Sequence, residues 1–118
     1  LETRESLIDG AELLADLPLD ALKFHQLQLV QNTRLANLYR ADPASVPLLS
    51  PPEYLDAVID MLERLPPTVK IQRLGSEVPP PLLVSPDWAM RLSRFPVLLE
   101  ARLIERQTWQ GRLFSRCP

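Results

Sequence analysis

Polar side chains interrupt an otherwise apolar run at residues 21–30. The run reads Ala-Leu-Lys-Phe-His-Gln-Leu-Gln-Leu-Val, so its polar members are Lys23, His25, Gln26 and Gln28. The apolar residues predict a strand, but a buried polar group costs free energy unless it is hydrogen-bonded. A strand with four such groups therefore indicates the wall of a ligand pocket rather than the interior of a plain sheet.

Two residues of this run have side chains suited to chemistry. His25 is able to donate to a ligand or to act as a general acid or base, and the alternative is a structural histidine bonded to backbone. Lys23 is a point charge that suits a carboxylate or a phosphate, and the alternative is a strand-end lysine that reaches solvent. The residue types alone leave both alternatives open.

A second group of candidate residues lies further along the chain. Gln72 and Arg73 end an expected strand at residues 68–74, just before Gly75. Because ligands bind at the carboxyl ends of strands in parallel α/β folds, Arg73 is well placed to hold an anionic ligand bidentately. A salt bridge to a carboxylate of the first half of the chain is the alternative. Trp88 either walls the same pocket or packs in the core.

Other catalytic patterns are missing from the sequence. There are three glycines, one histidine and one cysteine, Cys117, so neither a phosphate-binding glycine loop nor metal-ligand spacing is present. A single cysteine also excludes a cysteine-ligated cluster built from this chain alone. We predict no catalytic residue and no metal ligand, and we expect Cys117 to be an exposed, idle thiol.

Start and stop signals divide the chain into helices. Thr3 is a helix cap, and Pro18 ends the helix that it begins. Thr33 opens a short helix. Ser50-Pro51-Pro52-Glu53 is a capping box with proline at the first helical position, and Pro66-Pro67 stops the helix that follows.

The last part of the chain is predicted to be helical. Ser85-Pro86 begins this region, and Pro96 is expected to kink or divide it. Gly111 is a plausible C-terminal stop. The segment Thr108-Trp109-Gln110-Gly111 is expected to tie the chain end to the body of the protein.

The element order indicates an α/β fold. Strands at residues 21–30 and 68–74 are separated by helices, which predicts a parallel pair with a right-handed crossover. Two strands leave open edges, so we expect the closing segment of a larger parallel sheet or barrel. Open edges also predict that the chain self-associates, which light scattering would detect.

Composition places the chain among soluble globular domains. Its 118 residues, of which 46% are hydrophobic and 24% charged, are enough for one domain with a core. No apolar stretch approaches the roughly 18 residues of a membrane span, and residues 1–17 lack the uncharged core of a signal peptide. One cysteine is typical of a reducing compartment, so we predict a cytoplasmic protein without a membrane partner.

Charge is unevenly distributed along the chain. Residues 1–65 hold 5 basic and 11 acidic side chains, whereas residues 86–118 hold 6 and 3. The basic C-terminal third suits phosphate or an acidic neighbour, and the alternative is a solvated helix face with interspersed glutamates. This supports an alternative function, a non-enzymatic module that binds a protein or RNA through residues such as Arg91, Arg94 and Arg102.

Three ordered segments resemble the YhcC-type radical SAM proteins, a branch near the elongator-type radical SAM enzymes. The first segment is residues 22–30 followed by Thr33-Arg34-Leu35-Ala36, and Gln31-Asn32 between them depart from the family's common Lys-Gly. The others are residues 54–74 with Leu65-Pro66-Pro67 and Ile71-Gln72-Arg73-Leu74, and Leu83-Val84-Ser85-Pro86-Asp87-Trp88 with Thr108-Trp109-Gln110-Gly111. Glu2-Thr3 resembles the end of the family's Gly-Leu-Pro-Gly-Glu-Thr turn. The match covers nearly the whole chain in order.

The resemblance implies the last strands and helices of a partial (β/α) barrel with a helical C-terminal extension. Residues 1–118 would be one domain, with the barrel end at 1–74 and the extension at 75–118. In the full-length parent, a 4Fe–4S cluster would cleave S-adenosylmethionine to a 5′-deoxyadenosyl radical that abstracts hydrogen from an unidentified substrate. The cluster cysteines would lie in the missing N-terminal barrel portion, so this fragment alone would be inactive and bind no cofactor.

The same resemblance suggests roles for the candidate residues. Lys23, His25 and Gln26 would line the cofactor cavity. Gln72, Arg73 and Trp88 would border it on the substrate side.

Overall fold

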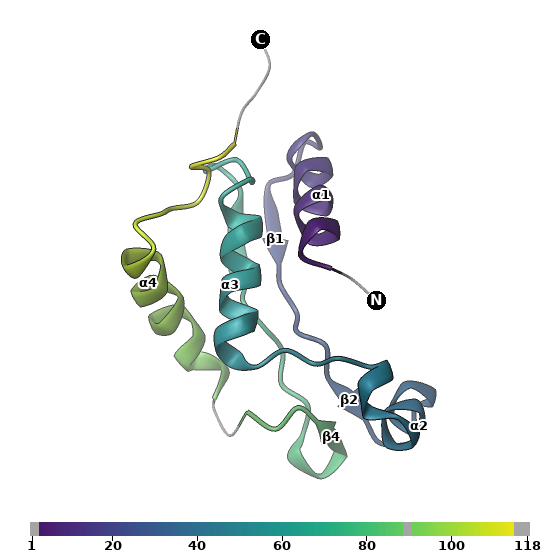
Figure 1. The fold of residues 1–118 in the computed structure, drawn as a ribbon. Helices are drawn as coiled ribbons and strands as arrows, with labels where there is room; N and C mark the ends of the chain where they lie inside the picture. The colour runs from purple at the N-terminus through teal and green to yellow at the C-terminus, as the bar shows by residue number, and fades with distance from the viewer. Residues whose placement is uncertain (1–2, 89–90, 115–118) are drawn as a thin grey trace.

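A computed structural model describes residues 3–88 and 91–114. These residues form four α-helices and four short strands, whose arrangement is drawn in Figure 1. In chain order they are α1 (Arg4–Ala15), β1 (Ala21–Lys23), β2 (Leu29–Val30), α2 (Arg34–Ala41), α3 (Pro51–Leu62), β3 (Lys70–Arg73), β4 (Leu83–Ser85) and α4 (Phe95–Glu105). Short 3₁₀ turns occur at Pro43–Ser45, Pro80–Leu82 and Leu92–Arg94.

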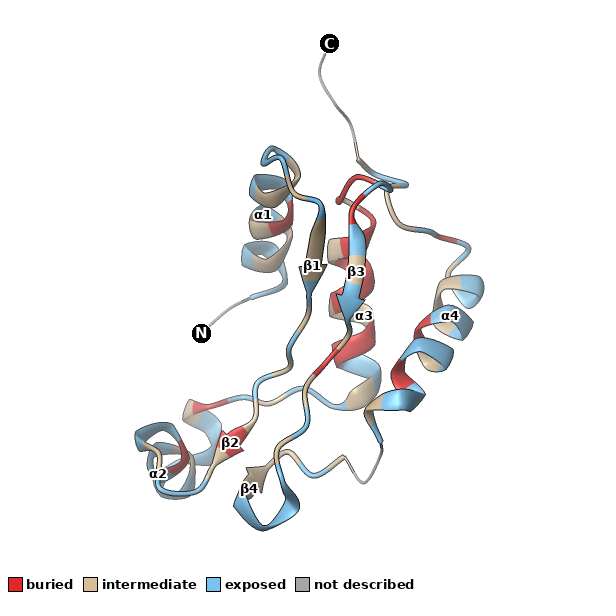
Figure 2. Cartoon of the chain, turned by 180° about the vertical axis from the view of Figure 1, so that it is seen from behind, coloured by how far each residue is buried: buried red, intermediate tan, exposed pale blue. Residues whose placement is uncertain are grey.

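Strands β1 and β3 form the parallel pair that the sequence predicts. Ala21 pairs with Lys70 and Leu22 with Ile71. Helices α1, α3 and α4 lie side by side over one face of this pair, with α3 in the middle (Figure 1). Seen from behind, no other described element covers the opposite face of β1 and β3 (Figure 2). One pair of strands does not make a closed barrel. The predicted barrel and the predicted boundary between barrel end and extension at residue 74 therefore stay predictions.

The prediction of a single strand at residues 21–30 is wrong. β1 ends at Lys23, and β2 pairs antiparallel with β4 in a second sheet. Between them, Gln26 Nε2 donates to the carbonyl of Ser76 and Gln26 Oε1 accepts from the Ser76 amide, both at 2.8 Å. A side chain thus takes the place of the backbone ladder where the two strands diverge, which is why the polar residues interrupt the strand.

The main core forms around α3. Its fully packed members come from α3, the turn after it and α4, and the strands contribute partly buried side chains. They are Tyr54, Leu55, Val58, Ile59, Leu62, Leu65, Phe95 and Leu99, with Leu22, Phe24, Ile71 and Leu74 packed against them. A smaller cluster of Leu29, Ala36 and Val46 lies under α2. The two clusters give the molecule an elongated shape of 50 × 26 × 24 Å.

Helix starts follow the predicted capping residues. The side chains of Thr3, Thr33 and Ser50 each accept a hydrogen bond from a backbone amide three residues later. Ser50 and Glu53 form the reciprocal capping box that the sequence indicates. These helix starts are confirmed.

The predictions for the last helical region are wrong in three respects. No helix begins at Ser85-Pro86, a cis peptide, and α4 begins at Phe95. Pro96 lies in the first turn of α4 and does not kink it, because the amides of a first turn have no intrahelical acceptor. The helix ends at Glu105, so Gly111 is not its stop.

Within residues 3–88 and 91–114, no helix is long and apolar enough to cross a membrane. Cys117 and Glu2, on which two predictions depend, lie outside the described residues.

Candidate functional site

The uncovered face of the β1–β3 sheet carries polar and cationic side chains. Leu22 and Ile71 pack against the helices, so strand alternation places Lys23, Lys70 and Gln72 on the opposite face. All three are exposed. We call this surface, together with Arg73, the open face.

A register shift brings Arg73 to the open face. Leu22 pairs with Ile71 but Lys23 pairs with Arg73, so β3 contains one extra residue, Gln72. Ile71 and Leu74 both pack against the core although they are three residues apart, which regular alternation does not allow. The bulge therefore turns Arg73 away from the helices and sets it beside Gln72, opposite Lys23. Sequence alternation alone gave no sign of this bulge.

The cations of the open face have no internal counter-ion. Among the described residues, no carboxylate forms an ion pair with Lys23, Lys70 or Arg73. The salt bridge considered for Arg73 is thus not formed with any described carboxylate. Within the described residues no side-chain hydrogen bond or ion pair occupies the guanidinium donors of Arg73.

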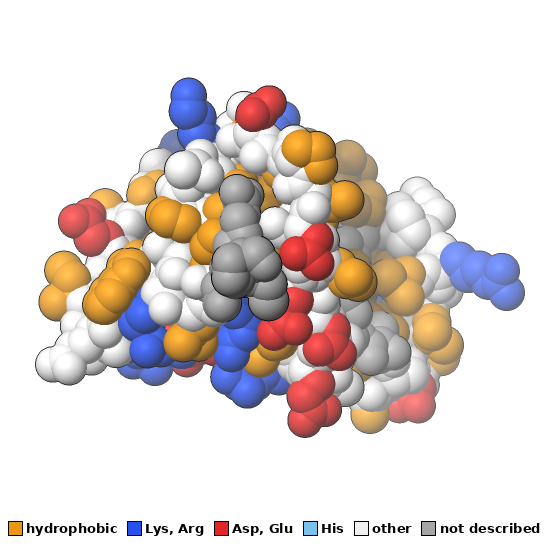
Figure 3. All heavy atoms as spheres, turned by 90° about the horizontal axis from the view of Figure 1, so that it is seen from above, with side chains coloured by type: hydrophobic (Ala, Val, Ile, Leu, Met, Phe, Trp, Pro, Cys, Tyr) orange, Lys and Arg blue, Asp and Glu red, His pale blue; other side chains and the backbone are white. Residues whose placement is uncertain are grey.

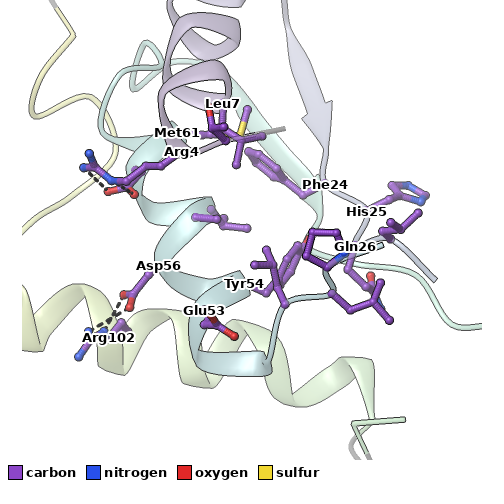
Figure 4. A pocket seen from close by; sticks show the side chains of 18 of the residues that line it. Arg4, Leu7, Phe24, His25, Gln26, Glu53, Tyr54, Asp56, Met61 and Arg102 are labelled. Atoms are coloured by element: carbon purple, nitrogen blue, oxygen red, sulfur yellow. Dashed lines mark hydrogen bonds and ion pairs between the residues drawn. The ribbon is translucent and has the colours of Figure 1, made fainter. Parts of the chain in front are cut away.

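A groove of about 1050 Å³ lies between α1, α3 and the segment that follows β1. Its apolar walls include Leu7, Phe24, Leu48, Tyr54 and Met61. Phe24 and Tyr54 point into the groove, while His25 lies at its outer edge (Figure 4).

Three aromatic rings, those of Tyr54, Trp88 and Phe95, pack against one another at one end of the groove. Trp88 lies 5.5 Å from Tyr54 and 5.5 Å from Phe95 between ring centroids. Its indole Nε1 donates to the Leu49 carbonyl at 3.1 Å, and the Tyr54 hydroxyl donates to the Leu74 carbonyl at 2.6 Å. Burial raises the pKa of Tyr54 to about 12. Trp88 is therefore both part of the core and part of the groove wall.

The polar residues after β1 serve different purposes. Gln26 is held by Ser76 as described above, and Gln28 Oε1 accepts from the Ser76 hydroxyl at 3.0 Å. A Cβ at Gly75 would lie 2.8 Å from Gln26 Oε1, so glycine permits this close approach. His25 is exposed and has no hydrogen-bond partner among the described residues, which differs from the structural histidine considered above. Of the four polar residues, Gln26 and Gln28 connect the segment after β1 to Ser76. The side chains of Lys23 and His25 form no hydrogen bond or ion pair with another described residue.

The structure thus gathers the candidate residues into two sets. Lys23, Gln72 and Arg73 share the open face, whereas His25, Gln26 and Trp88 border the groove. Both sets lie toward the carboxyl end of the parallel strands.

An arginine–carboxylate network joins α3 to its neighbours. Arg102 of α4 donates to both oxygens of Asp56, at 2.8 and 3.2 Å (Figure 4), and also pairs with Glu105. Arg4 of α1 and Arg106, the residue after α4, both pair with Asp60, at 2.9 and 3.1 Å. Arg102 and Arg106 of the basic C-terminal third therefore meet acidic neighbours on α3, one of the three outcomes considered.

The network continues to the end of the described chain. Glu63, 3% exposed, accepts from Thr108 at 2.5 Å and from Arg112 at 2.7 Å. Seen from above, basic side chains lie next to acidic ones at the surface (Figure 3). Asp56, Asp60 and Glu63 recur every three or four residues, a spacing that would have indicated a shared acidic helix stripe.

This network predicts a loss of stability in acid. Hydrogen bonds from Arg102 hold the pKa of Asp56 below its ordinary 3.8, in spite of partial burial. Burial raises the pKa of Glu63, but hydrogen bonds from Thr108 and Arg112 together with the charges of Arg106 and Arg112 outweigh it and bring the pKa below 4.5. Groups with a lowered folded pKa bind fewer protons in the folded state, so their stabilisation is complete above about pH 5 and falls as pH drops through the folded pKa values. The expected loss between pH 7 and pH 3 is about 1–2 kcal/mol, because exposure screens part of the Asp56 contribution.

Urea unfolding at a series of pH values measures this loss. The double variant Asp56→Asn with Glu63→Gln should be less stable at pH 7 and should show a flatter dependence below pH 5. Asp9→Asn removes an exposed carboxylate of α1 outside the network and should keep the slope. An unchanged slope in the double variant would contradict the assignment.

Comparison with known proteins then decides the family. The model of the Radical_SAM C-terminal domain matches residues 19–105, which is most of the chain. The chain belongs to the Radical_SAM C-terminal domain family. The matched region contains β1, β3 and all the candidate residues.

Two curated relatives match this radical SAM domain over nearly its whole length. Uncharacterized protein YtqA of Bacillus subtilis is 28% identical over 116 residues, which are 98% of this chain and 35% of YtqA. Uncharacterized protein MJ0486 of Methanocaldococcus jannaschii is 32% identical over 116 residues, with the same shares. The chain spans about a third of the length of the curated relatives that it matches.

Membership of the radical SAM family implies S-adenosylmethionine and a 4Fe–4S cluster in full-length proteins. The described residues do not fit the cluster: they include no cysteine and no group of three or more His, Asp or Glu that could hold a metal ion. The donor set of the open face does fit the carboxylate of S-adenosylmethionine, since it offers two cations and an amide. If S-adenosylmethionine were bound in a full-length protein it would supply radical chemistry, and Lys23, Gln72 and Arg73 would be the groups of this chain able to hold its carboxylate.

Proposed function

We propose that this chain forms the last wall of a (β/α) barrel in a radical SAM enzyme of unassigned substrate. The open face carries this proposal, because the β1–β3 sheet is covered by α1, α3 and α4 on one side only. In a parallel barrel, helices surround the outside and the inner face of each strand meets the cavity. The missing N-terminal barrel portion would pack against the open edges of the sheet.

The chain's own residues then act in binding and positioning. Lys23, Gln72 and Arg73 would face the cavity that holds the cofactor and the substrate. His25, at the outer edge of the groove, has no hydrogen-bond partner among the described residues. Gln26 and Trp88 also border the groove, and their side chains are fixed by Ser76 and Leu49. No catalytic residue is proposed in this chain.

The experiment requires the parent protein. The coding region upstream should contain a Cys-x3-Cys-x2-Cys motif or a variant of it. The parent, reconstituted with iron and sulfide without oxygen, should convert S-adenosylmethionine to 5′-deoxyadenosine on reduction. The 118-residue chain treated in the same way is the matched control and should form none. A parent without cysteines upstream, or without this product, would disprove the proposal.

The alternative of a protein- or RNA-binding module stays a prediction. Arg102, one of its three arginines, is held by Asp56 and Glu105, whereas Arg91 and Arg94 are exposed. Self-association through the open edges also stays a prediction.

A further inference from the structure

The open face places two cations directly opposite each other. The register of β1 and β3 pairs Lys23 with Arg73, and Lys70 lies on the same face at the other end of the pair. All three side chains are exposed, and none has an ion pair with a described carboxylate. Like charges opposite each other on a sheet are destabilising unless an anion lies between them.

The bulge in β3 makes this arrangement specific. In a regular strand without the bulge, alternation would direct Arg73 toward the core with Ile71. The bulge instead sets the guanidinium, the Gln72 amide and the Lys23 ammonium on one surface. A sheet face that served only solubility would not need this bulge, because β-bulges typically redirect a side chain.

We propose that Lys23, Gln72 and Arg73 form a binding site for one carboxylate or phosphate group. Arg73 would bind two oxygens of the anion side by side, because a planar guanidinium matches the geometry of both groups. Lys23 would neutralise the anion from the opposite strand as a point charge, and the Gln72 amide would donate a further hydrogen bond. This inference rests on the proposed function. It predicts that the ligand in the cavity of the proposed barrel carries an anionic group where it meets β1 and β3.

The test uses the 118-residue chain labelled with ¹⁵N. Inorganic phosphate and malonate are added separately, with sodium chloride at equal ionic strength as the reference. We expect concentration-dependent amide shifts centred on residues 22–24 and 72–74. If phosphate changes the amide shifts of these residues at a lower concentration than malonate does, the natural anion is a phosphate. If malonate acts at the lower concentration, the natural anion is a carboxylate.

Three variants distinguish a specific anion-binding site from nonspecific attraction of anions to positive charge. Lys23→Gln and Arg73→Gln should each weaken the binding of the preferred anion at least tenfold. Arg34→Gln removes an exposed arginine of α2, outside the β1–β3 pair, changes the net charge equally, and should leave the binding unchanged. Amide spectra of the free variants confirm that each is folded.

Two results would overturn the proposal. One is an equal response to sodium chloride, and the other is a set of shifts centred on Arg91 and Arg94 instead of the two strands. These outcomes are independent of the cysteine motif and of 5′-deoxyadenosine, so failure of the anion site and failure of the radical SAM proposal are distinguishable.

Discussion

Phe95→Ala should lower the free energy of unfolding by about 3–5 kcal/mol, the cost of truncating a buried aromatic side chain. Phe95 is 2% exposed and belongs to the main core. Its ring contacts both Tyr54 and Trp88, with ring centroids 5.7 and 5.5 Å away. Its loss would leave a cavity at the point where the start of α3, Trp88 and α4 meet. Because domains of this size are stable by only about 5–15 kcal/mol, much of the folded population would be lost.

Urea unfolding followed by circular dichroism measures this loss. Near-ultraviolet circular dichroism should weaken as well, because Trp88 loses one of its two ring neighbours. Val97→Ala is the control, since Val97 lies two residues further along α4 and is 65% exposed. It should change the stability by no more than about 0.5 kcal/mol. Equal effects of the two substitutions would mean that the aromatic cluster is not packed as described.

Gly111→Ala should destabilise the chain by about 2–3 kcal/mol. Gly111 has φ +89°, where an L side chain is strained by roughly 1–2 kcal/mol. An added Cβ would also lie 2.7 Å from Pro67 Cδ and 3.2 Å from the Pro67 backbone nitrogen, so the backbone itself must shift. That shift would weaken the hydrogen bond that the Gly111 amide donates to the Leu62 carbonyl at 2.9 Å.

Gly10→Ala is the matched control for this substitution. Gly10 lies inside α1, and an added Cβ meets nothing within 4 Å. Alanine there should stabilise the chain by about 0.5–1 kcal/mol, because glycine costs conformational entropy in a helix interior. Thermal unfolding of both variants compares the two changes, and opposite signs are expected. A destabilised Gly10→Ala together with a neutral Gly111→Ala would contradict the described turn.

The region around Gly111 ties the chain end to α3, as its sequence predicts. Gln110 Nε2 donates to the carbonyls of Pro66 and Val69, and the Leu113 amide donates to the Glu63 carbonyl. These bonds connect the segment after α4 to the turn between α3 and β3. They therefore help to hold the helices over one face of the sheet and leave the other face uncovered.

Local signals in the sequence determined the helix starts. Ser50 and Glu53 meet within four residues, so their capping box depends on almost nothing outside the segment. The parallel pairing of residues near 21 and 70 also followed from the order of the elements. The family could be recognised from ordered motifs for the same reason, because each motif is contiguous in the chain.

Long-range contacts decided the rest. The run at residues 21–30 has the composition of one strand, but Gln26 bonds to Ser76, fifty residues away, and β2 joins a different sheet. Pro96 begins a helix rather than breaking one, since its effect depends on where the helix starts.

The sequence by itself determined the family, the helix caps, the parallel strand pair and the candidate residues Lys23 and Arg73. Only the tertiary structure decided that these two side chains face each other on an uncovered sheet surface. The reason is the bulge at Gln72, which depends on how Ile71 and Leu74 both pack against the helices. Alternation along a strand fixes a side chain's direction only while the register holds, and the register is set by residues distant in sequence.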